Sequence, residues 1–210
     1  MRSDSDQYLV QRWQQSPWKE GIEVLIDPNC TKAQMDSLLK TLYPHGDQLV
    51  VVETFRGRGE FCDFRGLDLS GMNLRKVCFL RCDLSGGNFA RTDLVGTYFT
   101  VARLQNASFA GVVVNERVGF EDCFARGADF SGVHLVNADF SGAELVEVDF
   151  TGATLERCDF GNASLQNAKF DGTRMIDCNV QGARFSIKER DANFIARSTL
   201  RDADHIVWVD

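Results

Sequence analysis

Apolar residues recur at every fifth position from Cys62 to about Ile187, and this period restricts the fold more than any other feature of the chain. The stretches 128–132, 138–142 and 148–152 read ADFSG, ADFSG and VDFTG. In each unit a Phe or Leu stands at the centre, a small residue lies two positions before it, and a polar residue or Gly follows. A fixed short period is typical of a solenoid, in which each turn of the chain stacks on the previous one.

Neither a helix nor an alternating strand places apolar residues five positions apart. We therefore expect each five-residue unit to form one side of a coil, with its central and small residues turned inward. Central residues of one kind recur at intervals of 20, or once 21, and they fall into four columns. Two columns are rich in Phe (Phe79, Phe99, Phe120, Phe140, Phe160, Val180 and Leu69, Phe89, Phe109, Phe130, Phe150, Phe170) and two are rich in Leu (Leu74, Leu94, Val114, Leu135, Leu155, Met175 and Phe64, Leu84, Leu104, Ala125, Leu145, Leu165, Phe185). The sequence thus predicts a coil with four sides.

These units resemble the pentapeptide-repeat family, whose consensus is A(D/N)LxX, and the resemblance covers about 125 of the 210 residues. It implies a right-handed quadrilateral β-helix with the Phe and Leu side chains stacked along its axis. We therefore expect an all-β solenoid of about six coils over residues 61–187. A small α+β capping element is expected over residues 1–60, and degenerate repeats with a short C-terminal cap over residues 188–210.

Both ends of the repeat region need a cover, because an open coil exposes the core and unpaired strand edges. Residues 32–42 place Met35, Leu38, Leu39 and Leu42 on one helical face, and residues 22–26 and 48–54 have the pattern of strands. At the other end, residues 206–209 (IVWV) are apolar and need burial. They either cover the last coil or pair with the same segment of a second copy, since family members often dimerise through their C-terminal ends.

The repeat is interrupted once, between Val114 and Phe120, where Asn115, Glu116 and Arg117 hold one extra residue. We expect a corner bulge there, and the alternative is a protruding contact site. Several positions predicted to point outward are apolar: Leu80, Val95, Tyr98, Val101, Val113, Phe124, Val136, Val146 and Ile176. Those near the interruption define the candidate protein-binding surface, which comprises Tyr98, Val101, Val113, Asn115, Glu116, Arg117 and Phe124.

Composition disfavours several classes of protein. The chain has 30 acidic and 23 basic residues and a formal net charge of −7, so direct binding of nucleic acid is not expected. No run of 18 apolar residues exists, so we expect no membrane-spanning segment. The first twenty residues have no apolar core of the kind found in secretory signals, and we expect a cytoplasmic protein.

No pattern of residues indicates an enzyme or a metal site. Histidines occur only at positions 45, 134 and 205, and the sequence contains no Walker loop, no GxSxG motif and no HExxH motif. Five of the seven cysteines occupy the small inward position, where we expect free thiols that fill space and not disulfides or metal ligands: Cys62, Cys82, Cys123, Cys158 and Cys178. Asp before the central residue is expected to bond the backbone at the corner. We expect no catalytic residue, no metal and no cofactor.

The function predicted first is non-catalytic protein–protein binding by a rigid scaffold. The resemblance implies an alternative, because some family members protect DNA gyrase from quinolones and peptide toxins, apparently by imitating duplex DNA. Residues 61–186 carry 16 acidic and 12 basic residues, whereas about 30 Å of B-DNA carries roughly 18 phosphate charges. Asp129, Asp149, Asp139 and Asp159, in two columns interpreted as neighbours, form the candidate acidic face. The partner expected is therefore a protein, with DNA gyrase as the alternative and with no nucleic acid or membrane bound directly.

Overall fold

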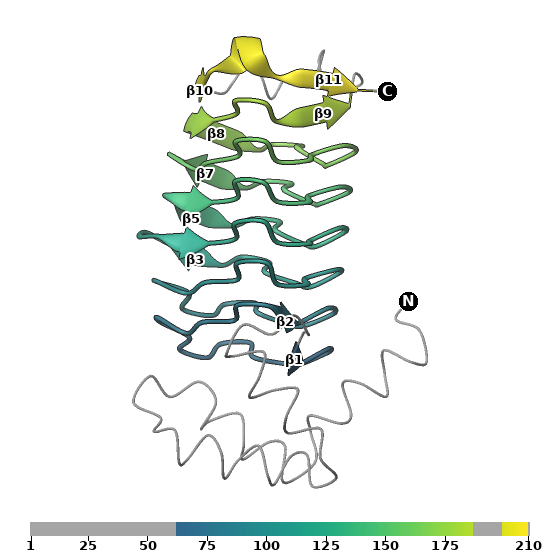
Figure 1. The fold of residues 1–210 in the computed structure, drawn as a ribbon. Helices are drawn as coiled ribbons and strands as arrows, with labels where there is room; N and C mark the ends of the chain where they lie inside the picture. The colour runs from purple at the N-terminus through teal and green to yellow at the C-terminus, as the bar shows by residue number, and fades with distance from the viewer. Residues whose placement is uncertain (1–61, 187–198, 210) are drawn as a thin grey trace, which may run out of the picture.

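The computed structural model describes residues 62–186 and 199–209. In this part of the chain the backbone winds as an all-β solenoid, and every strand pair is parallel (Figure 1). The α+β element predicted over residues 1–60 lies outside the described residues. The solenoid predicted from the five-residue period is confirmed.

The strands are short, because each side of the coil leaves only a few extended residues between two corners. They are β1 (Cys62–Asp63), β2 (Cys82–Asp83), β3 (Val113–Val114), β4 (Val118–Gly119), β5 (His134–Val136), β6 (Ala138–Asp139), β7 (Thr154–Glu156), β8 (Arg174–Asn179), β9 (Arg184–Ser186), β10 (Thr199–Arg201) and β11 (Val207–Val209), with a 3₁₀ turn, η1, at Ala203–His205. The longest, β8, runs through a corner of the coil. Elsewhere isolated bridges continue the same ladders, for example Asp139↔Asp159 and Asp149↔Lys169.

The pairing register confirms the four sides. Residues pair with partners 20 positions further along, as in Cys62↔Cys82, or 21 positions when the interruption intervenes, as in Tyr98↔Gly119. We number the sides in chain order by their central residues: side I contains Leu84 and Leu145, side II Phe89 and Phe150, side III Leu94 and Leu155, and side IV Phe99 and Phe160. Sides I and III lie opposite each other, and so do sides II and IV.

Phenylalanine rings from sides II and IV fill the axis of the solenoid. On side II the ring centroids of Phe109 and Phe130 lie 4.7 Å apart with an interplanar angle of 7°. On side IV those of Phe120 and Phe140 lie 4.8 Å apart at 4°. Rings from the two sides meet edge to face, as Phe109 and Phe120 do at 5.4 Å and 88°. The stacking distance equals the strand spacing of about 4.8 Å, so the backbone ladder sets the geometry of the aromatic core.

The small inward position holds side chains that fill the space beside each ring. Some buried hydroxyls and thiols at this position donate to a carbonyl of the preceding coil, as Thr173 Oγ1 does to Phe150 O at 2.6 Å and Cys178 Sγ to Leu155 O at 3.3 Å. Cys82, Cys123, Cys158 and Cys178 are buried at this position, as predicted for side chains that fill space. Nothing is described of the Cys62 side chain.

The corners follow one rule. Two residues after the centre the backbone adopts a positive φ at every corner from Gly66 to Gly182 except the one after Val114, at about half of these corners in Gly and at the others in residues such as Asn137 or Val101, which has φ 57°. The residue before the centre supports the corner when it is Asp or Asn, because its side-chain oxygen accepts the backbone N–H two residues ahead. Asp139 accepts from Ser141 N at 3.1 Å, and Asp159 accepts from Gly161 N at 2.8 Å.

The interruption of the repeat is a corner with one additional residue. β3 pairs with β5 at an offset of 21 residues and β4 pairs with β6 at an offset of 20, so the ladder resumes on both sides of residues 115–117. Asn115, Glu116 and Arg117 are exposed, and none of the three has a positive φ. The extra residue thus lets the chain turn this corner without the left-handed conformation.

Residues 199–209 lie on the last coil (Figure 1). β10 pairs with β8 and β11 pairs with β9, with Trp208 directly opposite Phe185 at a ring-centroid distance of 5.9 Å. Leu200, Ile206 and Trp208 pack partly buried against the core. The apolar C-terminal segment therefore covers the last coil of its own chain.

Candidate protein-binding surface

Large apolar side chains stand exposed on the outside of the β-helix. Leu80 is 41% exposed, Tyr98 40%, Val113 55% and Phe124 37%. Tyr98, Val113 and Phe124 occupy the position before a centre, where Asp or Asn elsewhere supports the corner. These three side chains cannot supply that acceptor, so the solenoid gains no corner hydrogen bond from them.

The structure does not bring the whole predicted surface together. Val113 lies on side III, Tyr98 on side IV and Phe124 on side I, with the partly exposed Val101 at the corner between sides IV and I. Asn115, Glu116 and Arg117 form the corner between sides III and IV. Phe124 thus faces away from Val113, whereas Tyr98 lies on side IV, which Val101 borders at one corner and residues 115–117 border at the other.

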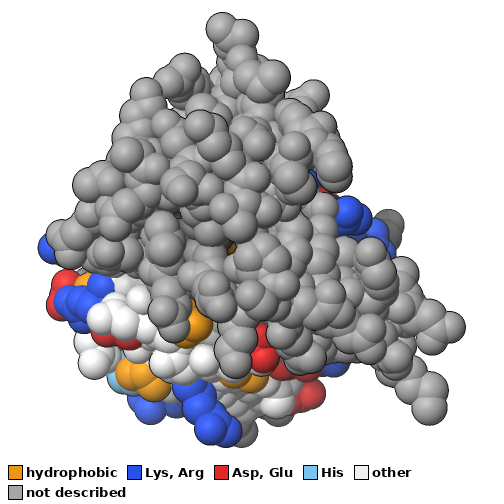
Figure 2. All heavy atoms as spheres, turned by 90° about the horizontal axis from the view of Figure 1, so that it is seen from below, with side chains coloured by type: hydrophobic (Ala, Val, Ile, Leu, Met, Phe, Trp, Pro, Cys, Tyr) orange, Lys and Arg blue, Asp and Glu red, His pale blue; other side chains and the backbone are white. Residues whose placement is uncertain are grey.

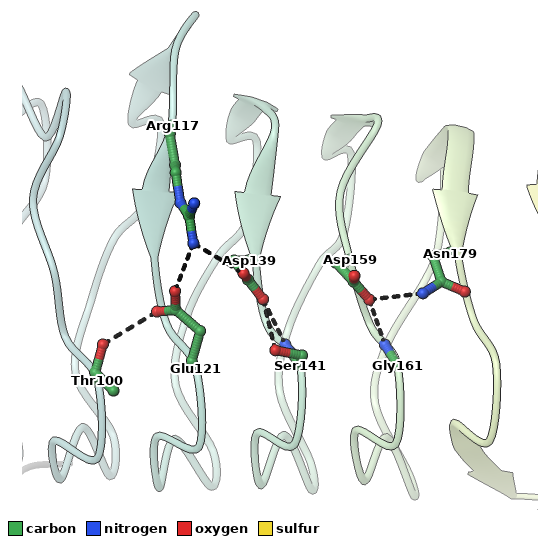
Figure 3. A network of polar contacts seen from close by, with 8 residues as sticks. All are labelled: Thr100, Arg117, Glu121, Asp139, Ser141, Asp159, Gly161 and Asn179. Atoms are coloured by element: carbon green, nitrogen blue, oxygen red, sulfur yellow. Dashed lines mark hydrogen bonds and ion pairs between the residues drawn. The ribbon is translucent and has the colours of Figure 1, made fainter.

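Side IV carries a connected polar network beside Tyr98 (Figure 3). From the corner, Arg117 Nη2 reaches Glu121 Oε1 at 2.9 Å and Asp139 Oδ2 at 3.2 Å, and Thr100 Oγ1 donates to Glu121 Oε2 at 3.1 Å. The hydrogen bond to Glu121 raises the pKa of the Arg117 guanidinium, and the charge of Asp139 adds to this. The extra corner residues therefore place a cation over side IV.

Tyr98 lies against the backbone of the next coil. A Cβ atom on Gly119 would meet Tyr98 Cδ1 at 2.8 Å and Glu121 Oε2 at 2.5 Å. Gly119 is therefore the residue that allows the ring and the carboxylate to lie flat on side IV. No sequence motif marks this role, since Gly119 stands where Asp is usual.

The prediction of one acidic face was wrong. Asp129 and Asp149 lie on side II, while Asp139 and Asp159 lie on side IV, the opposite side of the coil. The two columns are ten residues apart in the chain, which is two sides and not one. On side II, Lys169 Nζ also pairs with Asp149 at 3.0 Å. Although burial acts in the other direction, hydrogen bonds from Thr151 and the contact with Lys169 lower the pKa of Asp149.

Charge is mixed elsewhere on the surface as well. Arg126 pairs with Glu147 at 2.7 Å, and Arg103 pairs with Asp83 at 3.7 Å. In the view along the axis from the first coil, the visible described side chains include Lys and Arg, Asp and Glu, and apolar groups side by side (Figure 2). Neither positive nor negative charge dominates the described part of that face.

Two outward predictions also fail, because Val95 and Val136 are buried. Both directly follow a centre on side III. Val136 lies in β5, which has β3 on one side and β7 on the other, so coils about 4.8 Å away cover its side chain. Among the outward apolar residues, Leu80 lies on the same side as Tyr98, one coil earlier. Leu80 and Cys78 flank the centre Phe79, and Cys78 pairs with Tyr98 in the next coil. That column relation was already visible in the sequence.

The described part of the chain contains neither a cluster of metal-ligating residues nor a membrane-spanning helix. No three residues of the His, Cys, Asp and Glu types cluster in an arrangement suited to a metal ion within residues 62–186 and 199–209. Over the same ranges, no helix has the length and apolar character needed to cross a membrane.

The model of a family of pentapeptide repeats matches eight copies in this chain, over residues 60–89, 82–114, 126–162 and 149–186. These segments cover more than half of the sequence. The chain belongs to the pentapeptide-repeat family. The matched segments leave out residues 115–125, which include the corner with the additional residue.

Two of the solved structures that are similar to this chain are a quinolone-resistance protein and a pentapeptide-repeat protein. A trypsin-treated variant of QnrB1, a plasmid-mediated fluoroquinolone resistance protein, is 23% identical with a TM-score of 0.56, over 68% of this chain and 78% of the other. HetL from the cyanobacterium Nostoc sp. strain PCC 7120, a pentapeptide-repeat protein involved in heterocyst differentiation regulation, is 15% identical with a TM-score of 0.31, over 73% of this chain and 77% of the other. No curated protein matched the chain. At 23% identity the likeness to the QnrB1 variant concerns the fold alone.

Proposed function

We propose that this protein is a non-catalytic scaffold that binds another protein through the outer sides of its β-helix. The observation that supports this function is the exposure of Tyr98, Val113 and Phe124 at positions where Asp or Asn would stabilise the corner. An exposed aromatic side chain at such a position supplies no acceptor for the corner hydrogen bond, so it contributes little to the stability of the fold. Exposed apolar groups of this kind are typical of binding surfaces.

The backbone beneath these residues favours binding. The backbone at Tyr98 is fixed by ladder hydrogen bonds to the coils before and after it, because Tyr98 N donates to Val77 O at 3.0 Å and the next residue donates from Phe99 N to Gly119 O at 2.7 Å. The aromatic core holds the coils at a constant spacing. A partner that docks on such a surface orders few additional groups, so little conformational entropy is lost.

The test is site-specific photo-crosslinking in the cells that produce the protein. p-Benzoylphenylalanine replaces Tyr98 or Phe124, which exchanges one exposed aromatic side chain for another. We expect irradiation to give a discrete adduct of higher mass at one or both positions. The matched control places the same group at Thr151, an exposed residue on side II, where no such adduct should form. Absence of adducts at both aromatic positions, or equal adducts at Thr151, overturns the proposal.

A second candidate is binding of DNA gyrase as a mimic of duplex DNA. It is favoured by the acidic residues Glu121, Asp122, Asp139 and Asp159 on side IV, whose columns hold two basic residues, Arg81 and Arg201, within the described part of the chain. Supercoiling by purified gyrase, measured with and without a quinolone, tests it. Mimicry is supported if the wild-type protein inhibits gyrase, or protects it from the quinolone, and if this effect is lost when Asp139 and Asp159 become Asn. If the protein leaves the supercoiling activity unchanged, the mimicry hypothesis is excluded. A mimic is also expected to form a longer rod as a C-terminal dimer, which light scattering detects.

A further inference from the structure

We propose, on the basis of the binding function above, that side IV binds an α-helix of the partner protein. This helix lies along the solenoid axis, and its contacting face is apolar in one half of its length and basic in the other. One half of that helix is apolar and lies on Leu80 and Tyr98. The other half is basic and lies on Asp139 and Asp159. Four features of side IV lead to this partner: its division into two halves, its charge, its smooth surface and the spacing of its coils.

Side IV is apolar in its first coils and acidic further along. Cys78 and Leu80 flank the first centre and are exposed, and Tyr98 follows in the next coil. From the third coil the outward side chains become acidic, first Glu121 and Asp122, then Asp139 and Asp159. A partner that matches this side needs an apolar segment followed by a basic one.

The acidic half has spare negative charge. Arg117 is shared between Glu121 and Asp139. Among the described residues no cation pairs with Asp159, whose carboxylate accepts hydrogen bonds from Gly161 N at 2.8 Å and Asn179 Nδ2 at 2.9 Å. Both of these bonds use Oδ1, so Oδ2 of Asp159 stays available to a Lys or Arg of the partner. This is the complementarity of charge that selects a basic segment.

Small residues make the acidic half smooth. Gly119 and Gly161 occupy outward positions where larger polar residues are usual, and a Cβ on Gly161 would meet Asp159 Oδ1 at 3.0 Å. Ser141 is held against the surface, because its hydroxyl donates to Asp139 Oδ1 at 2.7 Å. With so few protruding side chains, the backbone of a partner helix can approach closely.

The spacing of the coils favours a helix over an extended segment. Outward residues recur about every 4.8 Å along the axis, and a helix repeats one face every 5.4 Å. By contrast, residues on one face of an extended strand recur about every 6.6 Å. From Leu80 to Asp159 there are four steps between coils, a distance of about 19 Å that a helix of about 13 residues spans.

The experiment measures fluorescence anisotropy of a labelled helical peptide with the full chain. The peptide carries Leu at one face of its first two turns and Lys at the same face of its last two turns, and a peptide of the same composition with scrambled order is the comparison. We expect the ordered peptide to bind and the scrambled peptide to bind at least about tenfold more weakly, because its apolar and basic groups no longer match the two halves.

Variants locate the binding. Asp139→Asn with Asp159→Asn removes two charges but keeps the corner acceptor, as Asn179 shows by accepting from Gln181 N at 3.1 Å. We expect this double variant to bind the peptide about fivefold more weakly at low salt. Leu80→Ser should weaken binding as well, because it removes an apolar side chain from the first half of side IV. The fold should tolerate this change, because Ser141 already occupies the same position in a later coil.

The matched control is Asp129→Asn with Asp149→Asn on side II, which removes the same two charges from the opposite side and should leave the affinity unchanged. Equal weakening by both double variants, or equal binding of the two peptides, overturns the helix proposal. Such a result leaves the crosslinking at Tyr98 and Phe124 unaffected, so failure of the helix proposal and failure of the scaffold function remain distinct.

Discussion

Replacing Phe140 with Ala should remove one layer of the aromatic core and strongly destabilise the solenoid. Phe140 is fully buried. Its ring stacks on Phe120 at 4.8 Å and on Phe160 at 5.0 Å, and it meets Phe130 edge to face at 5.6 Å. Loss of a buried Phe costs about 3–5 kcal/mol, and each aromatic pair contributes about 0.5–1.5 kcal/mol beyond its buried area. We therefore expect a loss near the upper end, about 4–5 kcal/mol.

The assay is chemical denaturation followed by circular dichroism at 25 °C, with Phe124→Ala as the matched control. Phe124 undergoes the same chemical change on the outside of side I, and its loss should cost less than about 1 kcal/mol. Because neighbouring coils stabilise one another, the Phe140→Ala variant should also unfold less cooperatively. Equal destabilisation by the two substitutions would refute the assignment of inward and outward positions.

Three further predictions use the same unfolding measurement. Val101 is β-branched and has φ 57°, so Val101→Gly should relieve about 1–2 kcal/mol of backbone strain; a lower melting temperature would contradict this. Ala138→Leu should cost about 1–3 kcal/mol, because it overpacks a fully enclosed inward position, whereas Asp139→Asn should be nearly neutral. Burial raises the pKa of the Cys123 thiol. This thiol keeps its proton in the folded state while an unfolded thiol ionises near pH 9.0, so the free energy of unfolding should fall as the pH rises above 9; a stability that stays constant or increases there would count against it.

Most of the fold could be predicted because one local rule repeats. The five-residue period fixes which side chain points inward, and the interval of 20 residues fixes the number of sides. Phe120 and Phe140 could therefore be placed on one stack, and Cys158 and Cys178 in one inward column, before any coordinates. The corner at Asn115 to Arg117 was visible as a single shift of phase.

The candidate site was harder to predict, because it depends on which sides are neighbours and on how far each side chain reaches. Asp129 and Asp139 are ten residues apart, which places them on opposite sides of a four-sided coil. Val136 follows a centre and was expected outside, but strands on both sides of β5 cover it. The position of Arg117 over Glu121 depends on the shape of an irregular corner, and a repeat pattern contains no information about it.

The central claim is that the exposed apolar residues of the outer sides serve binding and not folding. It is tested most directly by the free energy of unfolding of a variant that combines Tyr98→Asn, Phe124→Asn and Val113→Thr. Asn supports the corner at other coils, as Asn88 does by accepting from Ala90 N at 3.1 Å, and Thr154 already stands in the column of Val113. The account predicts a stability within about 1 kcal/mol of the wild type, or above it. A loss of more than about 3 kcal/mol would show that these side chains hold the solenoid together and would contradict the account.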